Sequence, residues 1–307
     1  MLLRLTTLLL ASSCVLFGAY TASRVAGPPS GFEPGGGLPK GVALNNNGVA
    51  LFNSVHLIYF VPTGYYGNSQ PFLATAINSP SPFATPLPLN NEFCCTTGYA
   101  LNDAGQVAGE GYGSFYSNAF VATTAGTTTV PTPGWNSSYA TAINNSGAIA
   151  GRGYYAGNDT PFVGSATGIT VLARKPAWGF VSMLALSDSG VAIGAAYLGP
   201  GIFELFTADT TGILSTQVMT GTDSTWSDIF PSVANKSGTL AGGGTVGGAY
   251  VAWVLTAGGA VQRLPTGDGW YSLSVTDINE NGEILGQGVR NGENVFWTYS
   301  AARVFWS

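Results

Sequence analysis

The sequence predicts an all-β fold, a six-bladed β-propeller whose blades are four-stranded antiparallel sheets of about 45 residues each. Three observations predict it. A ten-residue motif recurs six times, each repeat is long enough for four short strands, and Gly accounts for 44 of the 307 residues, so tight turns are frequent. Hydrophobic residues make up 45% of the chain, which is ample for a core.

The motif combines an apolar position, an Asn, a Gly three residues after it, and a second Gly four residues further on. Its copies read ALNDAGQVAG (100–109), AINNSGAIAG (142–151), ALSDSGVAIG (185–194), VANKSGTLAG (233–242), DINENGEILG (277–286) and, imperfectly, ALNNNGVALF (43–52). The first Gly stands at 48, 105, 147, 190, 238 and 282, so most steps span 42 to 48 residues, and the first step, of 57, contains one inserted loop. Because a single blade cannot bury its own faces, six copies predict six packed blades.

Within each repeat the four strands follow in order. The Asn-x-x-Gly stretch predicts the hairpin between the first two strands, because Asn opens a type I turn and Gly adopts the left-handed conformation of a G1 bulge. The third strand is centred 18 or 19 residues after the Asn in all copies but the first, and a short β-rich run supplies the fourth. The aromatic centres of the third strands are Phe72, Phe120, Phe162, Phe206, Trp253 and Trp297.

The N-terminal part of the chain predicts export. Residues 1–22 combine one Arg, a long apolar run and small residues, which is typical of a secretory signal peptide. Residues 23–40 are a linker and residues 41–307 form the propeller. A weak lipobox, LASSC, leaves lipidation of Cys14 as an alternative. We expect a secreted or cell-surface protein with no membrane-spanning segment in the mature chain.

The repeat resembles that of the HAF-repeat extracellular bacterial proteins, in which an A-x-x-N-x-x-G-x-Φ-x-G frame is followed by an aromatic strand. The His-Ala-Phe tripeptide that gives the family its name corresponds here to NAF (118–120), TPF (160–162) and VFW (295–297), so the His is missing. The resemblance covers about 265 residues and depends on regular recurrence. It implies a secreted propeller-like domain and no particular reaction.

The charge pattern excludes several partners. Charged residues are only 8% of the chain, against about 25% in an average globular protein. The formal net charge is −5, and the ten Lys and Arg residues form no cluster, so we expect no nucleic acid as partner. We expect no cofactor either, because the Gly-rich stretches lack the strand-to-helix context of a phosphate site.

Two sets of aromatic residues are candidates for ligand binding. An aromatic precedes each turn Asn, or Ser187, by nine residues in five copies: Phe93, Trp135, Trp178, Trp226 and Trp270. These residues are expected in the blade-to-blade connections, either as wedges between blades or as platforms for a sugar. The expected loops between second and third strands, on the same face, carry Tyr65, Tyr66, Tyr112, Tyr116, Tyr154, Tyr155 and Tyr197. Loops on a rigid scaffold commonly carry binding residues.

Catalytic and metal-binding chemistry has little support. His56 is the single His of the chain, so neither a Ser-His-Asp triad nor a His-based metal site is expected. The DINENG stretch (277–282) resembles the first half of a calcium loop, but Gly288 occupies the position of the bidentate Glu. The adjacent Cys94 and Cys95 interrupt a blade connection, and they form either a vicinal disulfide or two thiols.

These observations predict an exported, non-catalytic binding or adhesion module. The ligand we expect is a glycan or another cell-surface polymer, because aromatic faces and neutral amides suit sugars better than charged ligands. Two alternatives remain open: a structural scaffold of the cell envelope that contacts a surface protein, and a hydrolase or lyase acting on polysaccharide.

Overall fold

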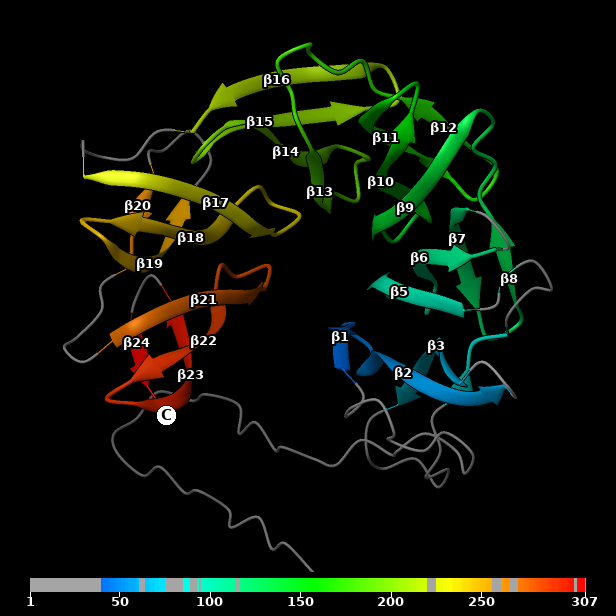
Figure 1. Ribbon diagram of the computed structural model, residues 1–307, viewed down its shortest axis with the longest axis horizontal. Coiled ribbons are helices and arrows are strands. Elements are labelled where there is room, and N and C mark those ends of the chain that lie inside the picture. The colour runs from blue at the N-terminus through cyan, green and yellow to red at the C-terminus, as the bar shows by residue number, and fades with distance from the viewer. Residues whose placement is uncertain are drawn as a thin grey trace, which may run out of the picture.

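Six four-stranded sheets are arranged as a ring in the computed structural model (Figure 1). The structure describes residues 40–60, 64–75, 85–88, 93, 95–113, 116–219, 225–255, 261–264, 270–300 and 303–306. Each sheet is built from four consecutive strands, and neighbouring strands are antiparallel. The predicted six-bladed propeller is confirmed. The predicted signal peptide, residues 1–22, lies outside the described residues.

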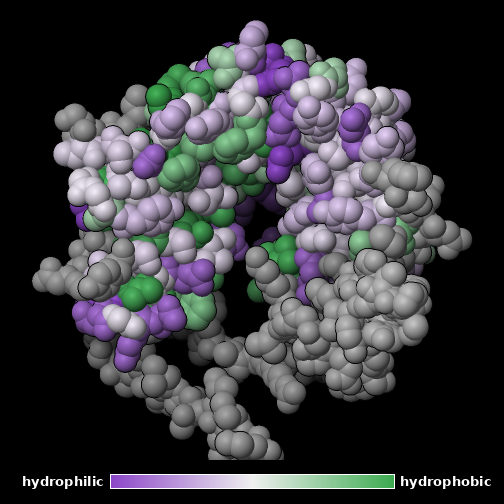
Figure 2. Space-filling model, viewed as in Figure 1, coloured by the Kyte–Doolittle hydropathy of each residue, from purple (hydrophilic) through white to green (hydrophobic). Residues whose placement is uncertain are grey.

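The first two strands of every blade form the hairpin that the motif encodes. The first strands are β1 (Lys40–Leu44), β5 (Cys95–Leu101), β9 (Trp135–Ile143), β13 (Val181–Leu186), β17 (Trp226–Ala234) and β21 (Trp270–Ile278). The second strands are β2 (Val49–Phe60), β6 (Val107–Tyr112), β10 (Ala148–Tyr155), β14 (Ala192–Gly199), β18 (Leu240–Val246) and β22 (Ile284–Arg290). First strands of successive blades contact one another, and Figure 2 shows an opening near the middle of the ring.

The third strands contain the aromatic centres, and the fourth strands are the short runs that follow. The third strands are β3 (Gly64–Thr75), β7 (Ser117–Thr123), β11 (Asn158–Ser165), β15 (Ile202–Asp209), β19 (Ala249–Leu255) and β23 (Glu293–Ser300). The fourth strands are β4 (Thr85–Pro86), β8 (Gly126–Thr129), β12 (Gly168–Val171), β16 (Gly212–Val218), β20 (Gln262–Arg263) and β24 (Arg303–Trp306).

Each motif turn has the predicted geometry. All six first glycines have positive φ, from 73° at Gly48 to 95° at Gly238, a conformation that favours Gly. In the second blade the Gly105 N–H donates to the Asn102 carbonyl at 3.1 Å, which closes the turn. The side chain of Asn102 adds a further bond, because its Oδ1 accepts the Gln106 N–H at 2.8 Å. The turn Asn therefore stabilises its own hairpin through its oxygen.

The nitrogen of the same amide joins neighbouring blades. The Nδ2 atom donates to the backbone carbonyl of the residue that holds the Asn position in the next blade. The bonds are Asn45 to Asn102 (2.9 Å), Asn102 to Asn144 (2.8 Å), Asn144 to Ser187 (2.9 Å) and Asn235 to Asn279 (3.0 Å). Asp cannot replace Asn here, because an ionised carboxylate only accepts. Ser187 lacks this donor, so the bond is missing between the fourth and fifth blades.

The second Gly of the motif makes room for the aromatic of the third strand. A Cβ on Gly109 would lie 2.7 Å from the Phe120 ring and 2.1 Å from the Thr97 carbonyl oxygen, so no other residue fits without a shift. The same close approach joins Gly151 with Phe162, Gly194 with Phe206, Gly242 with Trp253 and Gly286 with Trp297. In the first blade Phe52 takes the Gly position and stacks on Phe72, with ring centroids 5.5 Å apart.

The hydrophobic core is divided among the gaps between blades. Between the second and third blades, for example, Ala108 and Val121 pack with Ile149 and Phe162. Comparable clusters fill the four other gaps from the first blade to the sixth. Within the described ranges, no helix is long and apolar enough to cross a membrane.

The segments between second and third strands differ from the prediction, because strand occupies most of them. β10 runs to Tyr155, so that only Ala156 and Gly157 remain as the turn before β11. In the first blade β2 and β3 are each 12 residues long, so much of the insertion expected as a loop is an extended hairpin. Two antiparallel strands that continue in register satisfy each other's backbone groups, which an open loop leaves to water.

We expect Ser187→Asn to raise the free energy of unfolding by about 0.5–1.5 kcal/mol, the net contribution of one added hydrogen bond. The new Nδ2 would donate to the Asn235 carbonyl, as Asn144 donates to that of Ser187. Urea unfolding of the variant and the parent measures the difference.

The matched opposite is Asn102→Ala, which removes the bonds to Gln106 and Asn144. We expect the free energy of unfolding to fall by about 1–3 kcal/mol, because buried groups lose their partners. If the parent, Ser187→Asn and Asn102→Ala had the same free energy of unfolding, the turn amide would not hold the blades together.

Candidate functional site

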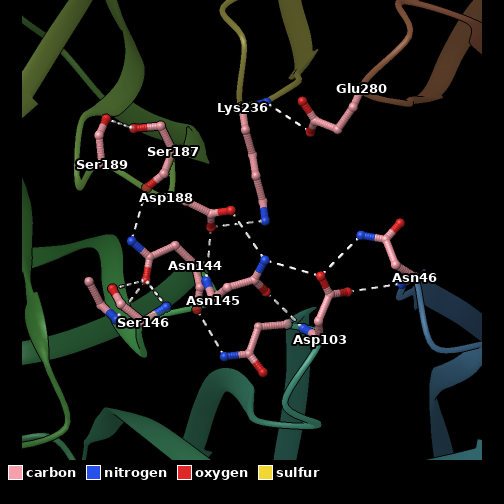
Figure 3. A network of polar contacts seen from close by, with 12 residues as sticks. Asn46, Asp103, Asn144, Asn145, Ser146, Ser187, Asp188, Ser189, Lys236 and Glu280 are labelled. Atoms are coloured by element: carbon pink, nitrogen blue, oxygen red, sulfur yellow. Dashed lines mark hydrogen bonds and ion pairs between the residues drawn. The ribbon is translucent and has the colours of Figure 1, made fainter.

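A chain of polar contacts runs among the motif turns at one end of the ring, from the first blade to the sixth (Figure 3). In four of the blades, the residue after the motif position donates its backbone N–H to the equivalent side chain in the next blade. These bonds run from Asn46 to Asp103 Oδ1 (2.9 Å), from Asp103 to Asn145 Oδ1 (3.0 Å), from Asn145 to Asp188 Oδ1 (3.0 Å) and from Lys236 to Glu280 Oε1 (3.1 Å). Between the fourth and fifth blades an ion pair takes over, with Lys236 Nζ 3.3 Å from Asp188 Oδ1.

The carboxylates of this turn end are occupied by their neighbours. The bonds that Asp103 accepts from the backbone and side chain of Asn46 hold the pKa of its carboxyl below the ordinary value. The Asn145 N–H, together with Lys236, does the same for the pKa of Asp188. This end therefore holds the blades in register. The opposite end, where the second strands finish, is called here the loop end.

Three tyrosines of the loop end are open to solvent. Tyr112, Tyr116 and Tyr154 are 44%, 58% and 46% exposed. Tyr112 and Tyr116 flank the β6–β7 connection, and Tyr154 lies near the end of β10 in the next blade. Two of the other predicted tyrosines, Tyr155 and Tyr197, are less exposed. Tyr155 stacks on Trp135 at 5.2 Å, and Tyr197 stacks on Phe180 at 5.0 Å. The side chains of Tyr65 and Tyr66 lie outside the described residues.

The repeated aromatics act as wedges between blades. They stand at or shortly before the start of the first strands, and all but Trp178 pack over a second-strand glycine. A Cβ on Gly153 would lie 2.8 Å from Trp135, and Gly244 and Gly288 approach Trp226 and Trp270 as closely. Each of these Trp residues joins a core cluster with the preceding blade. Trp135, Trp226 and Trp270 remain half-buried.

Trp178 requires a correction, because it is 2% exposed and no platform for a ligand. Its ring stacks on Phe206 at 4.8 Å, and its indole N–H donates to Glu204 Oε2 at 2.5 Å. Lys175 Nζ lies 2.6 Å from the other oxygen of Glu204. Burial alone would raise the pKa of Glu204, but the bonds from Lys175 and Trp178 outweigh it and hold the pKa below its ordinary value. The group is a structural anchor.

A buried carboxyl lies below the exposed tyrosines of the second blade. Glu110 of β6 is buried, and its Oε1 accepts the hydroxyls of Tyr99 and, at 3.4 Å, of Tyr112. Its Oε2 is buried and has no hydrogen-bond partner among the described residues. Burial raises the pKa of Glu110, while the two tyrosines and Arg152 of the next blade oppose this. Sequence reasoning missed Glu110, although it stands between two glycines in a strand that is otherwise uncharged.

Arg152 of β10 carries a paired charge on the third blade. Its Nη1 lies 3.2 Å from Asp159 Oδ1, and its guanidinium lies over the Tyr139 ring at 5.5 Å. The Asp159 carboxylate also accepts the Val181 N–H at 2.8 Å. The positive charge of Arg152 is thus balanced within the protein.

A second aromatic group at the fourth and fifth blades was also missed. Phe203 is buried and makes edge-to-face contacts with Phe180, Tyr197 and Phe230, at 5.5–5.9 Å. Phe180, Phe230 and the nearby Ile202 are exposed. Phe180 and Phe230 have no equivalent in the repeat pattern, so the motif could not reveal them.

The remaining sequence candidates are not brought into a site. Cys94 lies outside the described residues, so the vicinal disulfide stays a prediction, and Cys95 begins β5. His56 lies in β2, opposite Asn68, but its side chain is not described. In the part of the chain that the structure covers, no group of three or more His, Cys, Asp or Glu side chains could hold a metal ion.

The fold is similar to propeller domains of solved proteins. Prolyl oligopeptidase B from Galerina marginata, as apo protein, matches over 88% of this chain with 12% identity and a TM-score of 0.55. The same protein bound to a 35mer hydrolysis and macrocyclization substrate matches over 87% with a TM-score of 0.56 and 12% identity. TolB from Acinetobacter baumannii matches over 82% with 14% identity and a TM-score of 0.50.

These likenesses concern the fold alone. The chain spans 44% and 42% of the two prolyl oligopeptidase chains and 61% of the TolB chain. No protein-family model and no curated protein matches the sequence. The resemblance to HAF-repeat proteins therefore stays a prediction from the motif, while the structure establishes a six-bladed propeller whose fold is similar to parts of prolyl oligopeptidase B and TolB.

The Glu110 carboxyl should make stability depend on pH. Because its pKa in the folded protein lies above the ordinary 4.5, its contribution to folding is complete below pH 4.5 and is lost as pH rises through the folded pKa. We expect Glu110→Gln to flatten this part of the curve of melting temperature against pH. Thermal melts between pH 4.5 and about pH 8 measure it.

Glu204→Gln is the control, since the pKa of Glu204 is shifted in the opposite direction. It should lower the melting temperature at neutral pH and leave the slope above pH 4.5 intact. An unchanged slope in Glu110→Gln would contradict the assignment of that slope to Glu110.

Proposed function

We propose that the protein is an exported, non-catalytic binding module whose loop end contacts a neutral polymer, with a glycan as the first candidate. The observation that carries the proposal is the exposure of Tyr112, Tyr116 and Tyr154 at the same end of two neighbouring blades. A large aromatic ring left in water by a folded protein is a common feature of recognition surfaces. Here the rings are held by strands and tight turns.

The surroundings of these tyrosines favour a neutral ligand. Asn118 places an amide at the same end of the blades, whereas the Asn158 amide is engaged by Ala156 and Arg174. The charges nearby are already balanced, because Arg152 pairs with Asp159 and Glu110 is buried beneath Tyr112. Aromatic faces with neutral hydrogen-bonding groups suit the C–H faces and hydroxyls of a sugar.

Export follows from the N-terminal 22 residues and agrees with the low charge and the polar, Gly-rich surface. A non-catalytic role agrees with the carboxyl groups near the tyrosines. Glu110 is buried under hydroxyls and Asp159 is engaged by Arg152, so neither is free for general acid–base work. Release of reducing ends from a polysaccharide panel would overturn this part of the proposal and favour the hydrolase or lyase.

A scaffold that binds a surface protein is the second candidate. The exposed group of Phe180, Ile202 and Phe230 favours it, because contiguous apolar side chains on a soluble face commonly mark protein contacts.

The glycan proposal is tested with the double variant Tyr112→Ala/Tyr154→Ala on a glycan array. We expect binding to weaken by about ten-fold or more, the effect of losing aromatic contacts of this kind. Leu214→Ala is the matched control, since Leu214 is also exposed but lies on the outer strand β16 of the fourth blade.

Retention of full array binding by the tyrosine variant would remove the loop end of the second and third blades as the binding site. No binding of the parent protein to any arrayed glycan, with capture of a surface protein that is lost in Phe180→Ala, would favour the scaffold instead.

A further inference from the structure

The exposed ring of Tyr112 is tied to the inside of the protein through its hydroxyl group. Tyr112 is the last residue of β6, and its ring is open to solvent at the loop end. Its hydroxyl donates to Glu110 Oε1 at 3.4 Å and also shares a hydrogen bond with the side chain of Ser117, which lies opposite it on β7. Glu110 and Ser117 are both buried. The ring therefore faces solvent while its polar end is held by buried groups.

The two oxygens of Glu110 have different surroundings. Oε1 accepts the hydroxyl of Tyr99 of β5 as well as that of Tyr112. Oε2 is buried and finds no hydrogen-bond donor in the part of the chain that the structure describes. When the carboxyl ionises, the two tyrosine hydroxyls are thus the donors that stabilise its charge. A hydrogen bond to an ionised acceptor is about twice as strong as one to a neutral acceptor, so ionisation tightens the hold on Tyr112.

The ionisable groups that act on Glu110 come from its own strand and from two neighbouring strands. Burial raises the pKa of Glu110, and the hydroxyls of Tyr99 and Tyr112 and the positive charge of Arg152 of β10 oppose this. Tyr139 of β9 acts by charge on the two tyrosines. The negative charge of Glu110 is in turn the main cause that raises the pKa of the Tyr112 hydroxyl. The exposed tyrosine therefore senses the charge state of the buried carboxyl.

We propose that Glu110 is a positioning residue for Tyr112: its ionised carboxylate fixes the ring in the orientation on which a neutral sugar stacks, and its protonation loosens the ring. The inference rests on the glycan function proposed above and adds that binding at the loop end is controlled by pH. Affinity is highest with Glu110 ionised and falls as the carboxyl takes up a proton. By linkage, a bound sugar in turn favours the ionised carboxyl.

The first measurement needs no ligand. In the full chain labelled with ¹³C at the tyrosine Cζ, the Tyr112 signal should move between pH 4.5 and about pH 8 as Glu110 ionises, because this carbon bears the hydroxyl that Glu110 accepts. Glu110→Gln keeps an acceptor oxygen and loses the charge, so it should abolish the movement. Tyr112→Phe identifies the signal by removing it. Tyr116, whose hydroxyl is not among those that Glu110 accepts, is the internal reference.

The second measurement is affinity. Isothermal titration with cellohexaose, laminarihexaose and chitohexaose at pH 4.5 and about pH 8 should give, for a probe that binds, a dissociation constant about three- to ten-fold lower at the higher pH. Tyr112→Phe keeps the ring and loses the hydroxyl, so both this variant and Glu110→Gln should bind with an affinity that does not depend on pH.

Glu204→Gln is the matched control for the affinity measurement. Glu204 is also a buried glutamate, but its pKa is shifted in the opposite direction. This variant should therefore keep the pH dependence of the parent, and melting curves should show that every variant folds.

The outcomes separate this inference from the glycan function. Binding with the same affinity at both pH values would overturn the inference and leave the glycan function standing. A Tyr112 signal that stays fixed, or that moves equally in Glu110→Gln, would overturn it even if no probe binds. If no probe binds but the Tyr112 signal follows Glu110, the glycan function and its pH control are overturned, and the positioning of Tyr112 by Glu110 is supported.

Discussion

The side-chain amide of the turn Asn is the interaction on which the ring depends. Its oxygen closes the hairpin within one blade, and its nitrogen reaches the turn carbonyl of the next blade. Both bonds are largely buried, since Asn102, Asn144 and Asn235 have almost no exposed surface. A buried amide that satisfies a donor and an acceptor fixes geometry more strictly than apolar packing, because any slip leaves polar groups without partners. These bonds fix the distance between the motif turns of successive blades, and the first strands lie at that distance from one another.

The packing of side chains between blades is the second constraint. Flat aromatic rings lie on glycines of the second strands, as Phe120 does on Gly109 and Trp135 on Gly153. Each blade thus presents its aromatic rings to one neighbour and smaller side chains to the other. Together these side chains fill the gaps between blades. Aromatic side chains that pack between the sheets in this way are buried and cannot contact a ligand. Rings that the repeat does not require, such as Tyr112 and Tyr154, stay exposed instead.

The sequence predicted the blades better than the sites because the blades repeat and the sites do not. Six recurrences of one turn identified the fold, the strand order and the aromatic centres, all of which depend on contacts within about ten residues or on the repeat period. The sequence left Trp178 open as a wedge or a platform, because its burial depends on Glu204 and Phe206, which are distant in the chain. Phe180 and Phe230 belong to no repeated position, so the motif could not single them out. Glu110 did carry a local signal, as the one charged residue of its strand.

The sequence by itself determined the number of blades, the turn geometry and the division of each blade into four strands, because turns and strand periodicity are local properties of the chain. Only the tertiary structure decided which aromatic rings are buried and which carboxyls are paired. Those properties depend on what the neighbouring blade brings to each gap. Phe296 of the sixth blade, for example, is exposed at the position where the second, fourth and fifth blades pack a buried residue on the blade that follows.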